Sequence, residues 1–280
     1  MQTVGLTWQQ AGELAGALAL GGLAAARAAA PRARAAGAFL REGAMVAGLF
    51  ALWQLAGTLS TTDGAGAFSR ARWIERFDDR LPLPSEHTMQ QLVLGHPLVV
   101  QAANLYYATM HMTTMFAFLL WLFVRHRDRY RPVRSVVAVA TLGCLLVQLV
   151  PVAPPRMLPG IVDTGKLFGQ SVYSTGLPID QLSAMPSVHV CWAVIVGWYA
   201  WRVSPSRWRY LGPVHAVITC LVVVVTGNHW WLDGIVAVAI VVTSAWLVAG
   251  VRAGVGATLR RGRAVVPVAA PEPVSSGVPS

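Results

Sequence analysis

Residues 231–251 read WLDGIVAVAIVVTSAWLVAGV, an apolar run whose one charged residue, Asp233, lies near its start. The hydrocarbon core of a bilayer is about 30 Å thick and is crossed by about 20 mostly apolar residues in a helix. A run of this length and composition therefore predicts a transmembrane helix. The same search for long apolar windows without charge can be applied to the rest of the chain.

Five more windows qualify, and the last of the six ends near residue 252. They are approximately residues 43–60, 97–124, 135–152, 184–203 and 210–228. Their recurrence favours one helical bundle over two soluble domains. Composition agrees, because 55% hydrophobic and 12% charged residues exclude an ordinary soluble domain, a disordered chain and a collagen. We expect an all-α polytopic membrane protein with a six-helix transmembrane bundle over residues 43–252.

The remaining segments carry weaker signals. In the N-terminal segment 1–42, residues 11–26 are mainly Ala, Gly and Leu around Glu13, which suits either an additional span or a surface helix. Residues 70–80 alternate charge with aromatics, as in a helix that lies in the membrane interface. Residues 253–280 are basic and then rich in Val, Pro, Ala and Ser, which predicts a cytoplasmic tail that ends in disorder.

The net charge of +10 comes from 21 arginines and one lysine against 12 acidic residues. Sixteen of these basic residues lie in loops 27–42, 125–134 and 202–209 and after residue 251, where only three acids oppose them. Short basic loops stay in the cytoplasm. The basic charge is therefore a signal of membrane topology, and we expect a multi-pass protein of the cell membrane with no nucleic-acid partner.

Four ionisable side chains at span boundaries share the opposite, extracytoplasmic side: Arg156, His189, His229 and Asp233. Each is costly near hydrocarbon, so their convergence predicts a functional site. Taken singly, each could instead be an interfacial residue that caps a helix or snorkels. Taken together, the four favour a site.

The spacing of these residues indicates a reaction. Asp233 lies four residues after His229, so its carboxylate can accept from one imidazole nitrogen and leave the other nucleophilic. Pro186 suits a helix start, where the N–H groups of Ser187 to His189 could face an anion. Arg156 offers a planar fork for phosphate oxygens, and a protonated His189 could act as a general acid.

At these residues the chain resembles the type-2 phosphatidic acid phosphatase (PAP2) superfamily, and more closely its branch that includes inositol phosphorylceramide synthase. The resemblance spans residues 97–252. The family motif Pro-Ser-Gly-His appears as residues 186–189, PSVH, and the final His and Asp appear as His229 and Asp233. The resemblance implies a six-helix bundle, no metal or other cofactor, His229 as the phosphorylated nucleophile, His189 as the acid and Arg156 as the arginine of the first motif.

The chain departs from the common form of the family at four positions. Leu149 and Val223 stand where a Lys and an Arg are usual, Val188 replaces Gly, and Met157 replaces Pro. Without two cations, phosphate charge would rest on Arg156, protonated His189, the helix N-terminus and Asn228. These departures favour the transferase-like branch.

Two further features have plain alternatives. Asn104, Tyr107 and His111 share one face of the second span and could line a headgroup pocket, or make interhelical hydrogen bonds. The loop 153–182, with Asp163, Lys166, Tyr173 and Asp180, is long enough to cover the site and choose an acceptor, or is a solvated connector.

We therefore expect an enzyme that cleaves a lipid phosphoester or pyrophosphate at the outer leaflet. Water or an alcohol such as inositol could then accept the phosphoryl group, and the sequence leaves this choice, the lipid and the oligomeric state open. Two other classes compete. His189, His229 and Asp233 could hold a metal or a haem, although Arg156 would repel a metal ion. A non-catalytic lipid transporter or scaffold would need no nucleophile.

Overall fold

The computed structural model describes residues 7–60, 64–172 and 181–264. The described residues form helices and no β-strand, with one isolated parallel bridge between Val152 and Ser183, which confirms the all-α prediction. The α-helices are α1 (Trp8–Ala26), α2 (Pro31–Ser60), α3 (Gly64–Asp78), α4 (Glu86–Leu94), α5 (Pro97–Arg125), α6 (Arg127–Gln148), α7 (Thr164–Leu167), α8 (Val188–Val203), α9 (Leu211–Val225) and α10 (Trp231–Ala264). Two 3₁₀ turns, η1 (Pro155–Met157) and η3 (Arg207–Tyr210), join them.

Five helices are long and apolar enough to cross a bilayer: α2, α5, α6, α9 together with η3, and α10. The sixth predicted span is α8, which has only 16 residues because residues 184–187 are not helical. At 1.5 Å per residue α8 is about 24 Å long. Helix α1 has 19 residues but is not among the helices that are apolar enough for a span, so its relation to the membrane stays a prediction.

Several helices run past the predicted limits. The predicted loop 125–134 is almost entirely helical, because α5 and α6 meet at His126. Helix α2 begins at Pro31 inside the predicted loop 27–42, and α10 continues through the first part of the predicted tail, to Ala264. The search for apolar windows stops at the first charge, whereas backbone hydrogen bonding does not, since arginine is a good helix former. Residues 265–280, the predicted disordered end, lie outside the described residues.

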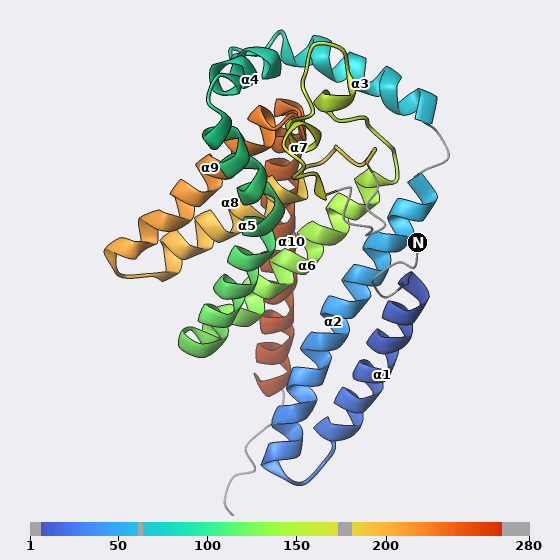
Figure 1. Ribbon diagram of the computed structural model, residues 1–280. Coiled ribbons are helices and arrows are strands. Elements are labelled where there is room, and N and C mark those ends of the chain that lie inside the picture. The colour runs from blue at the N-terminus through green and yellow to red at the C-terminus, as the bar shows by residue number, and fades with distance from the viewer. Residues whose placement is uncertain (1–6, 61–63, 173–180, 265–280) are drawn as a thin grey trace, which may run out of the picture.

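Helices α1 and α2 form an antiparallel hairpin beside the other helices (Figure 1). A Cβ atom added at Gly22 would lie 3.0 Å from the carbonyl oxygen of Gly37, so these two glycines let the helix backbones approach closely. Arg41 Nη1 donates to the Gly22 carbonyl at 3.0 Å. The hairpin is tied to the bundle through Glu42 of α2, which accepts from Tyr130 and Arg134 of α6.

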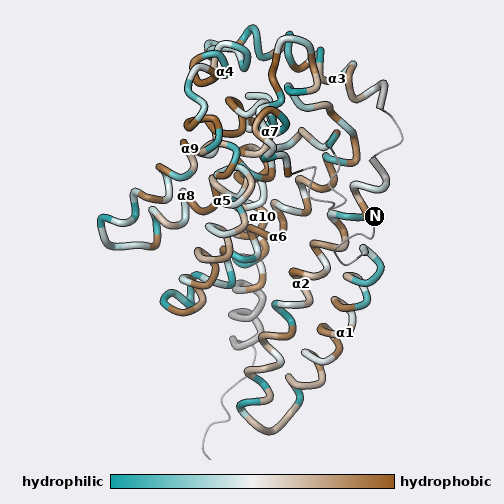
Figure 2. The backbone as a smooth tube through the Cα atoms, viewed as in Figure 1, coloured by the Kyte–Doolittle hydropathy of each residue, from teal (hydrophilic) through white to brown (hydrophobic). Residues whose placement is uncertain are grey.

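The bundle core lies where α5, α6, α8, α9 and α10 pack together, and it is made of small and branched apolar residues such as Leu122, Val136, Ile195 and Val224. Hydrophobic residues run along the long helices, whereas hydrophilic ones concentrate in α3, α4 and the turns at the opposite ends (Figure 2). This pattern is typical of a membrane protein whose helices are surrounded by lipid near their middle.

One end of the bundle is covered by α3 and α4, which lie across the ends of the long helices, with α7 beneath them (Figure 1). The predicted helix at 70–80 is α3, and it begins earlier, at Gly64. Ala67, Ala71, Ile74 and Asp78 are buried along one face of α3, whereas Trp73 is 56% exposed. Helix α4 was not predicted, and it completes this cover.

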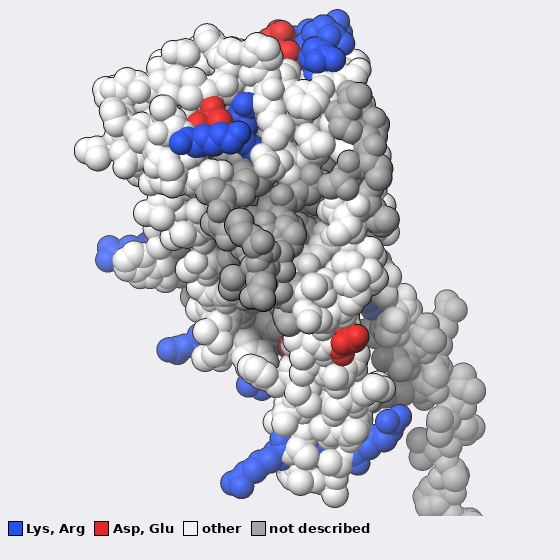
Figure 3. Space-filling model, turned by 45° about the vertical axis from the view of Figure 1, so that its right-hand side comes forward, with Lys and Arg blue, Asp and Glu red and all other residues white. Residues whose placement is uncertain are grey.

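Charge differs between the two ends. On the face shown in Figure 3, basic side chains at the lower end mostly stand apart from acidic ones, whereas near the covered end basic and acidic side chains lie side by side. This agrees with the uneven distribution of arginine along the chain.

Candidate functional site

His229 lies in the turn between α9 and α10, at the covered end of the bundle. Its Nδ1 atom is 2.7 Å from the carbonyl oxygen of Ala184 and 3.3 Å from Oδ2 of Asp233. Both partners are acceptors, so Nδ1 carries the proton in the neutral ring, and Nε2 holds a free electron pair. The pairing with Asp233 was predicted on one helical face. It forms instead from the turn to the helix, because α10 begins only at Trp231.

Asp233 holds several parts of the site together. It is fully buried, and Oδ2 also accepts the N–H of Trp230 at 2.9 Å, which caps the start of α10. Its backbone carbonyl accepts the N–H of Ser187 at 3.3 Å. Asp233 thereby links the turn of His229 to the start of α8, the helix that carries His189.

Helix α8 begins at Val188, later than the predicted start of its span at residue 184, and Ser187 is its N-cap. Pro186 therefore precedes the helix and does not lie in its first turn. The Ser187 hydroxyl accepts from the N–H of Val190 at 3.3 Å, and its own N–H is engaged by Asp233. Ser187 is therefore occupied in holding the helix start. Only the N–H groups of Val188 and His189 remain from the predicted anion-binding set.

His189 lies among the rings of α5. Its ring stacks on Tyr107, with centroids 4.2 Å apart, and contacts His111 at 4.1 Å. The rings of His189 and His229 are 5.6 Å apart. Of the three predicted lining residues on α5, Tyr107 and His111 therefore lie beside the two histidines.

The Nε2 atoms of His189 and His229 are both buried, and neither has a hydrogen-bond partner among the described residues. Leaving a buried polar atom unpaired costs about 1–3 kcal/mol. Two such atoms lie on neighbouring rings, where the oxygens of one ligand could hydrogen-bond to both.

Arg156 lies in η1, against the turn that precedes His229. Its side chain is buried, and Nη1 donates to Oδ1 of Asn228 at 2.8 Å. Its backbone N–H donates to the carbonyl of Gly227 at 2.9 Å. Gly227 has φ +69°, and a Cβ there would lie 3.0 Å from Ile161 and 3.2 Å from Cβ of Arg156. Only glycine fits this contact without strain.

Asn228 is predicted to help bind phosphate, and the structure shows its contacts within the protein. Its Oδ1 accepts from Arg156, and its Nδ2 donates to Oγ1 of Thr226 at 2.8 Å. The side chain thereby joins Arg156 to the turn of His229, and it can orient the guanidinium.

Asn104, the third predicted lining residue on α5, has contacts of a different kind. Its Nδ2 donates to the carbonyl of Thr164 at 3.0 Å and to Oε1 of Gln170 at 3.1 Å, and its Oδ1 accepts from Oγ1 of Thr164. The residue fastens the predicted loop 153–182 to α5. Tyr173 and Asp180 of that loop lie outside the described residues.

Two buried carboxyl groups, from α3 and α4, accept hydrogen bonds from the backbone at the start of α10. Oε1 of Glu86 accepts from the N–H of Trp231 at 3.1 Å, and Oδ2 of Asp78 accepts from the N–H of Leu232 at 3.2 Å. Burial raises the pKa of Glu86 from its ordinary 4.5 to about 7, and burial also raises the pKa of the neighbouring Asp78. Together with Asp233, these groups pair the first N–H groups of α10.

Gln90 lies one turn after Glu86 on α4 and is fully buried. Its Nε2 donates to the carbonyls of Val162 at 2.9 Å and Val225 at 3.3 Å, and its Oε1 accepts from the N–H of Val162. Helix α4 thus holds the end of α9, the start of α10 and the loop beside Arg156.

Comparison with known families places the chain in one of them. A family model described as the PAP2 superfamily matches residues 72–247, which is more than half of the chain. The chain belongs to the PAP2 superfamily. No curated protein and no solved structure matches it. As a PAP2 protein, the chain is a membrane protein of a superfamily of phosphoric ester hydrolases and related phosphotransferases.

Leu149 and Val223, the two positions where the resemblance places family cations, lie in different surroundings. Val223 is 2% exposed in the bundle core, and Leu149 is 42% exposed at the end of α6. Val188 begins α8 beside His189. Neither Leu149 nor Val223 thus supplies a positive charge to the site.

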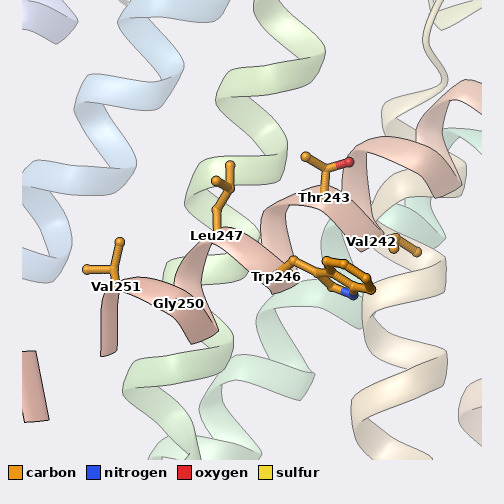
Figure 4. Close-up of a pocket in the computed structure, with 6 residues that line it drawn as sticks. All are labelled: Val242, Thr243, Trp246, Leu247, Gly250 and Val251. Atoms are coloured by element: carbon orange, nitrogen blue, oxygen red, sulfur yellow. The ribbon is translucent and has the colours of Figure 1, made fainter. Parts of the chain in front are cut away.

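Metal-ligand clusters and grooves are two further kinds of feature that could form a site outside the histidines, in the part of the chain that the structure describes. No group of three or more His, Cys, Asp or Glu side chains there could hold a metal ion. A groove runs along α10 and is lined by Val242, Thr243, Trp246, Leu247, Gly250 and Val251 (Figure 4). The one hydroxyl in it, on Thr243, donates to the carbonyl of Ala239, so the groove offers an apolar surface to lipid.

Sequence reasoning missed Glu86, Gln90, Asp78 and Gln148, whose Nε2 donates to the carbonyl of Pro186 at 3.3 Å. A local signal for α4 was present, because Ser85 is an N-cap that accepts from Thr88 and Gly95 ends the helix. No local signal shows which backbone groups these side chains meet.

Proposed function

We propose that this PAP2 protein is a membrane-embedded lipid phosphatase or phosphotransferase that works through a phosphohistidine on His229. The observation that carries the proposal is the pair of buried, unpartnered Nε2 atoms on His189 and His229, with Nδ1 of His229 already engaged. A phosphate group between two such atoms would meet a nucleophile on one side and a proton donor on the other.

The reaction has two steps. Nε2 of His229 attacks phosphorus, a P–N bond forms, and the bond to the departing alkoxide breaks while His189 gives that oxygen a proton. An acceptor, water or an alcohol, then loses a proton to His189 and attacks phosphorus, which releases His229. Arg156 stabilises the equatorial oxygens, and Ala184 and Asp233 hold the proton on Nδ1. No metal or other cofactor is needed for these steps.

The acceptor is proposed to be an alcohol, which makes the protein a lipid phosphotransferase of the inositol phosphorylceramide synthase-like branch. The support is electrostatic: Leu149 and Val223 lack the cations of the common phosphatase form, and Asn228 orients the arginine that remains. A site with fewer cations suits a less charged phosphate group.

The chemistry is proposed to take place on the extracytoplasmic face of the cell membrane, because the basic residues gather at the other end of the helices. Single cysteines at Gly160 and Arg129, in a cysteine-free background, test this in intact cells with an impermeant reagent. Labelling at 160 alone is expected. Labelling at 129 alone would place the site inside.

The activity test uses purified protein with radiolabelled phospholipids and isoprenoid pyrophosphates, with and without candidate alcohols such as inositol. New labelled lipid or phosphate ester that depends on the alcohol and on His229 supports the transferase, and free phosphate supports the phosphatase. Full function of His229→Ala in cells would favour the transporter or scaffold class, whereas turnover by the purified variant would contradict His229 as the nucleophile. Loss of activity on chelation, or a haem absorption band, would favour the metal or haem class.

A further inference from the structure

A fixed negative charge lies beside the proposed phosphate site. Oδ2 of Asp163 is 3.6 Å from Nε of Arg156 and 3.7 Å from Nζ of Lys166. The side chain of Arg156 is 2% exposed and that of Lys166 is 71% exposed, so the ion pair with Arg156 is the one that solvent screens least. The carboxylate therefore offsets part of the charge that Arg156 could offer to phosphate.

Asp163 is held in place on both sides. Its Oδ1 accepts from the N–H of Lys166 at 3.0 Å. The residue before it, Val162, is bonded in both directions to Gln90 of α4, and the residue after it, Thr164, is bonded to Asn104 of α5. A carboxylate anchored from two helices stays near Arg156 when a ligand arrives.

Phosphate groups differ in the charge that they bring to such a carboxylate. A phosphodiester carries one negative charge at all ordinary pH values, whereas a phosphomonoester gains a second charge with a pKa of about 6. At distances of several Å and an effective dielectric constant of about 20, one more unit of like charge weakens binding by roughly tenfold or more. A fixed carboxylate therefore disfavours the dianion more than the monoanion.

We propose that Asp163 is a specificity-determining residue that makes the site select phosphate groups with a single negative charge, and hence phosphodiester lipids over phosphomonoester lipids. This inference rests on the proposed function, since it takes Arg156 and His229 as the phosphate site. It also gives the loop 153–172 a function, because Asp163 of this loop would discriminate between donor lipids by the charge of their phosphate group.

The test uses two short-chain lipids that differ by one methyl group and one charge: phosphatidic acid and phosphatidylmethanol. Release of diacylglycerol by the purified full-length protein reports cleavage of both. Titration of the histidines affects kcat/KM for both lipids equally, so it cancels in the ratio of the diester value to the monoester value. We expect a ratio of at least about 10 near pH 8 that shrinks near pH 5, where the monoester loses its second charge.

Asp163→Asn should lower this ratio by about tenfold or more near pH 8 and flatten its dependence on pH. Asparagine is also a good N-cap, so the variant keeps the bond from the Lys166 N–H. Asp163→Glu retains the charge and should retain the preference. Asp79→Asn is the matched control, because it removes the same charge from an exposed position after α3 and should leave the ratio unchanged.

Two results would overturn the inference. One is a wild-type protein that prefers the monoester near pH 8, and the other is an unchanged ratio in Asp163→Asn while release still depends on His229. If neither lipid gives release that depends on His229, the proposed function fails and the role of Asp163 fails with it. The two failures are distinguishable by the His229→Ala variant.

Discussion

The Nδ1 atom of His229 lies closer to the backbone carbonyl of Ala184, at 2.7 Å, than to the carboxylate of Asp233, at 3.3 Å. A backbone carbonyl can only accept, so it fixes the protonated state of Nδ1 whatever residue stands at 233. The orientation of the proposed nucleophile therefore has two independent supports, one from the segment before α8 and one from α10.

Asp233→Asn should consequently reduce turnover by on the order of 10²-fold, less than the roughly 10⁴-fold loss known for the serine-protease aspartate, whose histidine takes the wrong tautomer in the amide variant. The amide oxygen can still accept from the N–H of Trp230. Steady-state kcat of the purified variant is the measurement. A loss near 10⁴-fold would show that the Ala184 contact does not hold the tautomer, and a loss under tenfold would leave Asp233 with a capping role only.

Gly227→Ala should destabilise the protein by about 1–2 kcal/mol from the positive φ alone, and should also reduce turnover because the new Cβ displaces Arg156. Thermal unfolding in detergent and kcat are measured together. Gly160→Ala is the matched control, since Gly160 has φ +92° and open space around it. It should share the loss of stability and keep its turnover, so equal turnover losses in both variants would contradict the contact.

Glu86→Gln should change how stability depends on pH. The pKa of Glu86 is raised from 4.5 to about 7, so the folded protein retains a proton that the unfolded chain releases. The stabilising effect of that proton is complete below pH 4.5 and is lost as the pH rises to about 7. Glutamine still accepts from the N–H of Trp231 and does not ionise. As the pH rises from 4.5 to about 7, the thermal unfolding midpoint of the variant should therefore fall less than that of the wild type.

Three other carboxyl groups face Glu86: Asp78 and Glu75 from α3, and Asp233 from α10. Since Asp78 also has a raised pKa, the stability of Glu86→Gln should still depend on pH to some extent. The double variant Asp78→Asn/Glu86→Gln should show a weaker dependence. An identical pH slope in the wild type and in Glu86→Gln would show that Glu86 does not hold the proton.

Arg156→Lys should not be a mild change. The guanidinium donates to Asn228 through Nη1 and faces Asp163 through Nε. The ammonium of a lysine has no planar set of donors that could contact Asn228, Asp163 and a phosphate at the same time. One charge-assisted contact is worth about 1.5–3 kcal/mol, or roughly 10- to 150-fold, and the loss should appear in kcat with KM little changed. Near-normal kcat would mean that another cation, such as Lys166, carries the phosphate.

The sequence predicts the all-α bundle of long apolar helices because the length of an apolar run is set by the thickness of the bilayer. It predicts Arg156, His189, His229 and Asp233 at one end because span boundaries alternate between the two sides. It does not predict where the helices end, as α10 shows by continuing to Ala264 through charged residues.

The contacts that tune the site escape sequence reasoning for a different reason. Ala184 and Val162 act through backbone groups, which every residue has, so nothing in their side chains marks them. Asn104 and Asn228 were singled out as polar, and polarity alone did not show that their partners are the loop at Thr164 and the side chain of Arg156. Such partners are fixed by packing between segments far apart in the chain.

The central claim is that His229 becomes phosphorylated and that His189 handles the protons on either side of that intermediate. The most direct test incubates His189→Ala with a radiolabelled aryl phosphate ester, whose departing oxygen needs no proton, and locates the label by peptide mapping. The first step should still proceed and the second should be slow without a base for the acceptor, so acid-labile label should accumulate on the peptide that contains His229. Label on another residue, or label that persists when His229 is also replaced, would contradict the account.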